Sequence, residues 1–416
     1  MNHREPADPA ATTVDHPDAG ADRRGVAGIA QGAVLILGGM LPTMAVIALV
    51  PALPALLEHF ARARHAQLIV PMMISTPGLM VAVLAPLAGQ LIDRLGRRNI
   101  LLLAGLVYPV AGVAPFFLHA LTTMFACRIA VGVTEAFILT GVNALIGDYF
   151  QERGRRTLLA TQAFVMPVLT TLLLMLAGRL TGWMWDGSFL VYLLALPVFL
   201  GFVLYVFEPP QARRPPARAD RTMPALGQVL RISAGFGLAT LLASVFFFAC
   251  VIQGAIAFKA IGVASPQRIG VLLGIANLGS PAGAIVLAVL RKAAPKRLAS
   301  VVFVMIGAGL LLMGLARTGV GMTGAMFVAE IGAGMLVATF ILWAHGVLPA
   351  ELRGRGMGLW CSCFYLGEFL APVAFAAARA ATGRALGAFA LLGVASMVCG
   401  LGLLLAAGRR PAALGS

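Results

Sequence analysis

Four ionisable side chains lie inside long apolar stretches of the sequence, where a charge needs a physical reason. Arg128 and Glu135 share one stretch, Glu330 lies in a second and Glu368 in a third. A charged side chain at the centre of a membrane-spanning helix costs about 2.5–3.5 kcal/mol on insertion scales. We therefore treat these four residues as candidates for binding a charged group, exchanging a proton or tying helices together.

Arg128 and Glu135 are seven residues apart, which places them two turns apart on nearly one face of a helix, about 10 Å along its axis. Gly132 lies between them on that face and leaves room for a neighbouring helix or a ligand. We expect this pair to respond to the charge or occupancy of a substrate. The structural alternative is that Arg128 only joins helices through hydrogen bonds.

Glu330 has no cation within two turns on its own helix, and Glu368 is in a similar position. A carboxyl group without a partner in an apolar setting is suited to binding and releasing a proton. We predict that Glu330 exchanges the proton and that Glu368 is the next candidate. Each could instead be a neutral acid that makes one hydrogen bond between helices. The remaining candidate cavity residues, for which helix packing is the alternative role, are Asn143, Trp343, Trp360 and Tyr365.

A short polar segment separates two apolar runs that are each long enough to cross a bilayer. It reads Gly89-Gln90-Leu91-Ile92-Asp93-Arg94-Leu95-Gly96-Arg97-Arg98. Two spans joined by so few residues must be antiparallel neighbours. The glycines allow close backbone approach or a turn with positive φ. Asp93 can accept hydrogen bonds at a helix N-terminus or pair with an arginine.

This segment resembles the loop signature Gly-x-Leu-x-Asp-Arg-x-Gly-Arg-Arg of the major facilitator superfamily, and Arg128-x-x-x-Gly132 resembles the fourth-span signature of that family. The resemblance implies an all-α membrane protein of twelve transmembrane helices in two pseudo-symmetric six-helix bundles. It implies transport by alternating access through a central cavity, with the fourth-span arginine taking part in proton transfer.

The resemblance also implies a latch at the cytoplasmic face that closes against the start of the eleventh span near Gly356. Its residues would be Gly89, Asp93, Arg94, Gly96, Arg97, Arg98 and Asp148. The alternative is that these are solvated loop charges. Drug antiporters of the family carry a glycine-rich signature in the fifth span, whereas this chain has only Pro167 there, and its first span lacks a buried acid. These departures argue against efflux by antiport and do not affect the predicted fold.

Composition places the chain in a membrane, since 60% of its residues are hydrophobic, 11% are charged and the mean hydropathy is +0.93. Soluble proteins carry roughly a quarter charged residues. The net charge of +15 comes from arginines in short loops, which is typical of orientation signals and not of nucleic-acid binding. The five cysteines all lie in apolar runs, so we interpret them as small buried hydrophobes.

The apolar runs predict twelve spans: 27–57, 68–92, 99–119, 122–147, 157–180, 188–207, 233–260, 268–290, 298–316, 321–347, 357–378 and 384–408. Prolines predict bends in the first span (Pro42, Pro51, Pro54), and a Gly-Pro kink near Pro281 in the eighth could serve as a gate hinge. With the N-terminus inside, 22 of the 31 Lys and Arg residues lie on the inner side and eight outside, leaving only Arg128 within a span. Both termini are therefore predicted to be cytoplasmic, in a multi-pass protein of a bacterial inner membrane.

The domain prediction is a disordered tail 1–26, a six-helix bundle 27–207, a cytoplasmic linker 208–232, a second bundle 233–408 and a tail 409–416. Internal repetition supports two similar halves. Glu152-Arg153-Gly154-Arg155 recurs as Leu352-Arg353-Gly354-Arg355, a shift of 200, and Arg97-Arg98 recurs as Lys296-Arg297, a shift of 199.

These features predict a secondary active transporter and not an enzyme. The first choice is proton-coupled efflux of a small, partly hydrophobic compound; the second is proton-coupled uptake of a small organic metabolite, and a non-transporting scaffold or membrane enzyme is a remote third. The histidines are scattered and no Gly-x-x-x-x-Gly-Lys loop occurs, so we expect no metal, nucleotide or other cofactor. The expected partners are a small-molecule substrate, protons and the lipid bilayer, for a monomer that binds no nucleic acid.

The predicted topology can be tested by labelling introduced cysteines in a background without the native five. Cysteines at Ala63 and Thr382 should react with a membrane-impermeant maleimide added to intact cells, and one at Ala219 should not, because the linker lies inside. Labelling at position 219 from outside would overturn the twelve-span topology.

Overall fold

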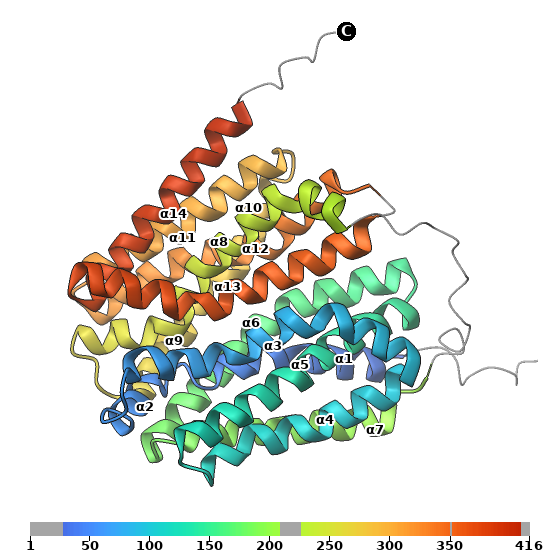
Figure 1. Ribbon diagram of the computed structural model, residues 1–416, viewed down its shortest axis with the longest axis horizontal. Helices are drawn as coiled ribbons and strands as arrows, with labels where there is room; N and C mark the ends of the chain where they lie inside the picture. Colours follow the sequence, from blue (N-terminus) through green and yellow to red (C-terminus); the bar gives the residue numbers. More distant parts are fainter. Residues whose placement is uncertain (1–27, 209–225, 350–351, 409–416) are drawn as a thin grey trace, which may run out of the picture.

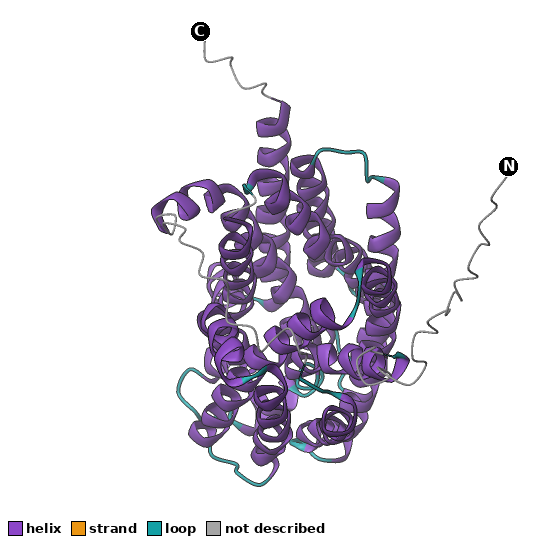
Figure 2. Ribbon diagram, turned by 90° about the vertical axis from the view of Figure 1, so that its right-hand side faces the viewer, coloured by secondary structure: helices purple, strands orange, loops and turns teal. Residues whose placement is uncertain are grey.

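The computed structural model of the chain describes residues 28–208, 226–349 and 352–408. Within these ranges every regular element is a helix and no strand occurs (Figure 2). Twelve stretches are long and apolar enough to cross a membrane, which confirms the predicted all-α membrane fold. The predicted tails 1–26 and 409–416, most of the linker and Ala219 lie outside the described residues.

Six spans precede the linker and six follow it. The first six are α1 (Ile29–Ile47) with α2 (Leu53–His59), α3 (Ala66–Leu95), α4 (Arg97–Val113) with the 3-10 helix η1 (Ala114–Phe116), α5 (Leu121–Tyr149), α6 (Glu152–Trp183), and the 3-10 helix η2 (Gly187–Leu194) with α7 (Ala195–Tyr205). The second six are α8 (Leu226–Ala260), α9 (Pro266–Asn277) with α10 (Gly279–Val289), α11 (Pro295–Leu315), α12 (Gly319–Val347), α13 (Arg353–Thr382) and α14 (Ala385–Gly408).

Several helices extend beyond the apolar runs that predict them, because helical hydrogen bonding continues into the polar loops. The fifth span begins at Glu152 instead of 157, and the seventh begins at Leu226, inside the predicted linker. The repeated loop sequences lie at equivalent places: Arg97 and Lys296 are in the first turns of the third and ninth spans, and Glu152 and Arg353 begin the fifth and eleventh.

The first span is interrupted as its prolines predict. Residues 48–52 separate α1 from α2 and form hydrogen bonds between residues three apart, such as Leu49 N to Val46 O at 3.1 Å. Because the Leu49 amide turns to Val46, the carbonyl of Ala45 loses the amide that an α-helix would supply. This carbonyl faces the interior of the bundle and needs another donor.

The eighth span is interrupted between α9 and α10, three residues before Pro281. Proline cannot donate a backbone hydrogen bond and breaks the helix on its N-terminal side. Glycines then let α10 pack tightly on α12, since a Cβ added at Gly279 would lie 2.9 Å from the Cβ of Glu330. The predicted kink is confirmed, and it adjoins one of the candidate acids.

The helices form two bundles, α1–α7 and α8–α14, whose main contacts are α3 along α13 and α6 along α9. We call the end that carries the Gly89–Arg98 hairpin the basic end and the other the opposite end. In Figure 1 the bundles come together at the left, where α2 and α9 lie, and the helices of the second bundle rise away toward the upper right.

Polar side chains join the two bundles at the opposite end. Glu58 of α2 forms an ion pair with Lys259 of α8. Arg379 of α13 donates a hydrogen bond to the Gln67 side chain of α3 at 2.8 Å. Both links connect residues that are distant in sequence, and both close the same end of the interface.

Close backbone packing seals the same end. A Cβ added at Gly178 of α6 would lie 2.6 Å from the carbonyl oxygen of Pro266 and 3.0 Å from Gly270 Cα of α9. Only glycine fits at such a distance, as in other tightly packed membrane helices. The backbones of the two bundles therefore touch directly here.

Toward the basic end the same two spans separate. Leu158 is the one buried residue in the first half of α6, whereas six buried residues follow between Thr170 and Thr181. In the partner span, α9 buries five of its residues and α10 buries only Gly279 and Gly283. The interface between the bundles is thus closed at the opposite end and parted at the basic end.

Replacing Gly178 with valine should force α6 and α9 apart. Overpacking of this kind costs about 1–3 kcal/mol, so the purified Gly178→Val protein should unfold at a lower temperature than wild type. Gly346→Val is the matched control, because no atom of the described residues, apart from the backbone of its own helix, lies within 4 Å of a Cβ added at that glycine. Equal unfolding temperatures for the two variants would show that the seam is not closely packed.

Candidate functional site

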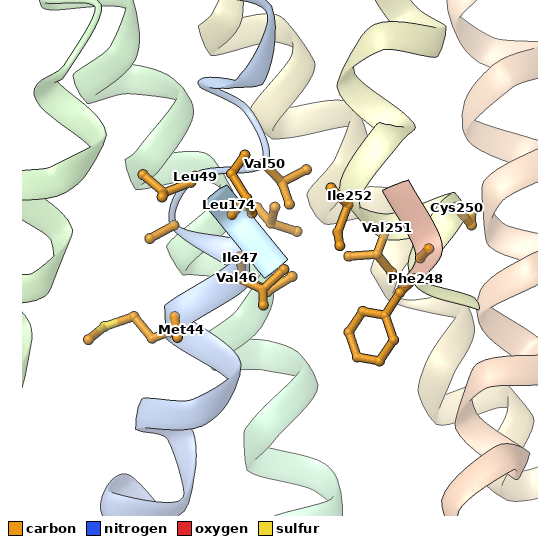
Figure 3. Packing of buried hydrophobic residues seen from close by; sticks show 14 of the residues in the cluster. Met44, Val46, Ile47, Leu49, Val50, Leu174, Phe248, Cys250, Val251 and Ile252 are labelled. Carbon is orange, nitrogen blue, oxygen red and sulfur yellow. The ribbon is translucent and has the colours of Figure 1, made fainter. Parts of the chain in front are cut away.

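A cavity of about 260 Å³ lies between the two bundles, midway along the spans. Its wall is built from α1, α6, α8, α10, α12 and α13, with Asn277 of α9. Figure 3 shows part of it: Val46 and Ile47 of α1 point toward Phe248 and Val251 of α8 in the other bundle. Both bundles contribute to the wall, so a relative movement of the bundles must change its shape.

Glu330 reaches the cavity from the middle of α12. Its side chain is 8% exposed and lines both the central cavity and a small adjoining one of about 20 Å³. The helix break before α10 lies directly beside it, because Gly279 packs on its Cβ. No Lys, Arg or His side chain forms an ion pair with Glu330 in the described part of the chain.

Glu368 reaches the same cavity from α13. It is 2% exposed, and its Oε1 has no hydrogen-bond partner among the described residues. Its carboxyl group lies against α3 of the other bundle, where a Cβ added at Gly78 would be 2.7 Å from Glu368 Cδ. Glycine at position 78 therefore makes the space that the acid occupies.

Glu135 is buried to 1% exposure beside the cavity but does not line it. Its Oε2 has no hydrogen-bond partner within the described ranges. It interacts electrostatically with Glu368 across the bundle interface and with Arg128 on its own helix. Gly132 lets this helix press against α3, because an added Cβ would lie 2.6 Å from Pro77 Cα. The structure thus brings Glu135 near Glu368, a proximity that the sequence did not predict.

Arg128 is 1% exposed and is enclosed within the first bundle. Its Nη1 donates to the hydroxyl of Tyr192, and its Nη2 donates to the carbonyls of Ala45 and, at 3.2 Å, Ile74. Its Nε donates to the Met73 carbonyl at 3.4 Å. All three nitrogens are engaged, so one guanidinium joins the first, second, fourth and sixth spans.

Two of the carbonyls that accept hydrogen bonds from Arg128 lack their helical donor. Pro77 has no amide hydrogen, so the carbonyl of Met73 one turn earlier lacks its helical donor. The carbonyl of Ala45 is freed by the break after α1, and it also accepts a hydrogen bond from Tyr192 at 2.9 Å. The arrangement supports the structural role of Arg128.

Of the other candidate cavity residues, some lie at the cavity wall and others lie away from it. Tyr365 lines the cavity one turn before Glu368, and Trp360 stacks on Phe364 of the cavity wall with ring centres 5.8 Å apart. Trp343 is buried against Phe340 inside the second bundle. Asn143 is exposed near the basic end of α5 and does not line the cavity.

Three residues of the predicted latch, Asp93, Arg97 and Asp148, lie together at the basic end of the first bundle. Arg97 forms an ion pair with Asp148 and lies 3.7 Å from Asp93, which is 65% exposed. Gly96 has a φ of +91°, and Gly89 lies in the last turns of α3 with Thr140 the only neighbour within 4 Å of an added Cβ. Arg94 lines a groove formed by α3 and α5.

These latch contacts stay within the first bundle. At the start of α13, a Cβ added at Gly356 would meet Leu348 of its own bundle. The closure against Gly356 that the resemblance implies therefore belongs to another conformation than this one. It remains a prediction.

Sequence reasoning missed Glu208, which caps α4. Its carboxylate accepts hydrogen bonds from the backbone amides of Arg97, at 3.0 Å, and Arg98, at 2.8 Å. Arg98 in turn donates to the Val206 carbonyl at 2.8 Å. An acid at the end of the sixth apolar run was the available signal, because a carboxylate is stabilised at a helix N-terminus.

Comparison with known proteins gives consistent results. The family model described as Major Facilitator Superfamily matches residues 35–372. The multidrug efflux pump LfrA of Mycolicibacterium smegmatis is 29% identical over 187 residues, which span 44% of this chain and 36% of that protein.

Solved structures share the fold. The nucleoside transporter NupG superposes with a TM-score of 0.73 at 11% identity, over 90% of this chain and 99% of that one. A bacterial homolog of the human lysosomal transporter Spinster, inward-facing and unoccupied, gives 0.66 at 15% identity over 91% and 94% of the two chains. The human organic anion transporter MFSD10 gives 0.66 at 19% identity over 90% and 99%.

The enclosed position of Arg128 leads to a prediction about stability. Arg128→Met removes the donor of the Met73 carbonyl and one hydrogen bond from each of the Ala45 and Ile74 carbonyls, and a carbonyl left unpaired in the interior costs about 1–3 kcal/mol. The variant should unfold at a much lower temperature than wild type in a size-exclusion thermal assay, while Arg94→Met on the exposed hairpin should not. A stable, monodisperse Arg128→Met protein that fails only in transport would instead indicate a direct role in transport.

Proposed function

Because this chain belongs to the Major Facilitator Superfamily, we propose that it is a proton-coupled exporter of a small, partly hydrophobic compound. The observation that carries the proposal is the cavity between the bundles, whose apolar wall contains the carboxyl groups of Glu330 and Glu368. A wall shared by two bundles can open to one side or the other as the bundles move.

We infer that the basic end faces the cytoplasm, because the excess of Arg and Lys in short loops marks the inner side. The interface is parted at that end and joined by Glu58, Lys259, Gln67 and Arg379 at the other. The described conformation is then open toward the cytoplasm, ready to receive a compound for export. The multidrug efflux activity of LfrA supports this direction.

Glu330 is the group that we assign to proton exchange. It is buried, it faces the cavity and it has no ion-pair partner in the described chain, so its charge state is free to change. The helix break between α9 and α10 adjoins it, which places a flexible point of the backbone beside the proton site. Glu368 faces the same space and is the second candidate.

Glu135 has a different role in this proposal. The sequence pairs it with Arg128, but the guanidinium is occupied by carbonyls and by Tyr192. Across the bundle interface Glu135 interacts electrostatically with Glu368 of the cavity wall. We infer that Glu135 senses the state of the cavity through Glu368.

The latch residues are assigned to the opposite conformation. When the bundles close at the basic end, the hairpin with Asp93 and Arg97 approaches the start of α13 near Gly356. In the described conformation these residues are held ready by Asp148 and by the Glu208 cap on α4.

Transport into everted membrane vesicles tests the proposal. With the vesicle interior acidified by respiration, wild-type vesicles should accumulate members of a mixture of small aromatic compounds, measured by mass spectrometry, and should lose them when nigericin collapses the gradient. A proton symporter working in the uptake direction would not accumulate its substrate under this gradient, so the same measurement separates export from uptake.

Glu330→Gln should abolish this gradient-driven accumulation, because glutamine mimics the protonated acid permanently. Glu152→Gln, at an exposed ion pair near the basic end, is the matched control and should transport normally. If Glu330→Gln accumulates compound at the wild-type rate and Glu135→Gln does not, the proton assignment is reversed. If both retain full coupling, Glu368 carries the proton.

A further inference from the structure

We propose that the transported compound is a small aromatic monocation, an amine or pyridinium type of molecule, whose charge lies between Glu330 and Glu368. The inference rests on the proposed function and names its substrate class. Both carboxyl groups face one cavity, from neighbouring spans of the same bundle, and the cavity is the space that a substrate would occupy.

The charge of the wall selects the sign of the ligand. The residues that line the cavity include two acids and no Lys, Arg or His. Arg128 is the nearest buried cation in the described chain, and its nitrogens donate to backbone carbonyls and to Tyr192 inside the first bundle. A carboxylate or phosphate in this cavity would find no positive partner, whereas a cation would find two negative ones.

The aromatic part of the wall favours a flat, positively charged ring. Phe247 and Phe248 come from α8, and Phe364 and Tyr365 come from α13, one turn before Glu368. The rings of Phe248 and Phe364 meet edge to face at 5.5 Å, so the two helices present a continuous aromatic surface beside the acid. Cations bind to such ring faces, and more strongly where water is excluded.

The side-chain amide in the cavity wall is already engaged by protein groups. Asn277 Nδ2 donates to the Pro167 carbonyl at 2.9 Å and to Thr171 Oγ1 at 3.2 Å. This amide links α9 to α6 across the bundle interface. A volume of about 260 Å³ also limits the ligand to roughly two aromatic rings.

One positive charge on the ligand and one bound proton together are enough to neutralise the two carboxyl groups. A monocation compensates one carboxylate, which takes up the exchanged proton when the cation leaves, while the second carboxyl group stays protonated. A second positive charge on the ligand would require the second carboxyl group to lose its proton as well. The cavity is therefore suited to one cationic group and one proton, in alternation.

Probe binding tests the substrate class without any gradient. Tritiated 1-methyl-4-phenylpyridinium would be bound to the purified full chain in lipid nanodiscs, with empty nanodiscs as background. Displacement would be measured with the unlabelled probe, with 4-methylbiphenyl, which has the same shape without charge, and with biphenyl-4-carboxylate. The cation should displace at least about tenfold more effectively than the neutral isostere, and the anion should not displace.

Variants locate the charge. Glu330→Gln and Glu368→Gln should each weaken binding of the probe by about tenfold or more, Glu330→Asp should retain most of it, and the control Glu152→Gln should bind as wild type. Equal displacement by the neutral isostere in wild type overturns the proposal without any variant, as does unchanged probe binding in both glutamine variants.

The result is separable from the proposed export. If the pyridinium binds through the two acids but a pH gradient does not move it, proton-coupled export fails and the substrate class stands. If a pH gradient moves neutral aromatic compounds while the pyridinium does not bind, the substrate class fails and export stands.

Discussion

A polar backbone group inside a membrane must find a partner in the protein, and this requirement shapes the first bundle. Its helices contain prolines and a broken first span, which release the carbonyls of Met73 and Ala45 from their usual donors. Arg128 and Tyr192 supply donors to these carbonyls. A guanidinium suits the task because its donors fan out in one plane and can reach several helices at once. The bundle can therefore bend without leaving these carbonyls unpaired, and the hydrogen-bond partners of the buried cation are carbonyls and a hydroxyl group.

The two acids of the cavity wall, unlike Arg128, have no fixed partner of opposite charge among the described residues. With the guanidinium committed elsewhere, Glu330 and Glu368 are left without a fixed counter-ion in the described chain, and glycines at positions 78 and 279 bring backbone close to them. A proton or a cationic ligand can supply the partner that these groups lack. Because these carboxyl groups lack counter-ions in the described chain, the site can respond to a proton and to a cation. This site lies where the two bundles meet.

The fold could be predicted from the sequence because span length, loop charge and the Gly89–Arg98 hairpin are local features. The breaks at residues 48–52 and 278 follow from prolines in the same way. Glu330 and Glu368 were identifiable because an acid in an apolar run is conspicuous, and both reach the cavity. The environment of Arg128 could not be predicted, since its acceptors lie on three other spans and most of them are backbone carbonyls without a sequence signal. The cap by Glu208 and the pair of Glu58 with Lys259 escaped for a similar reason, because each joins residues more than 100 positions apart.

The ion pair of Glu58 with Lys259 is largely exposed to solvent, unlike every contact that lines the cavity. An exposed pair contributes only about 0.2–1 kcal/mol, and dissolved salt weakens it further. The balance between the two faces of the transporter is thus partly controlled by groups that the surrounding solution can reach. The ionic strength of the solution on that side of the membrane should therefore affect the rate at which this end opens. The same molecule should open at different rates in concentrated and in dilute salt.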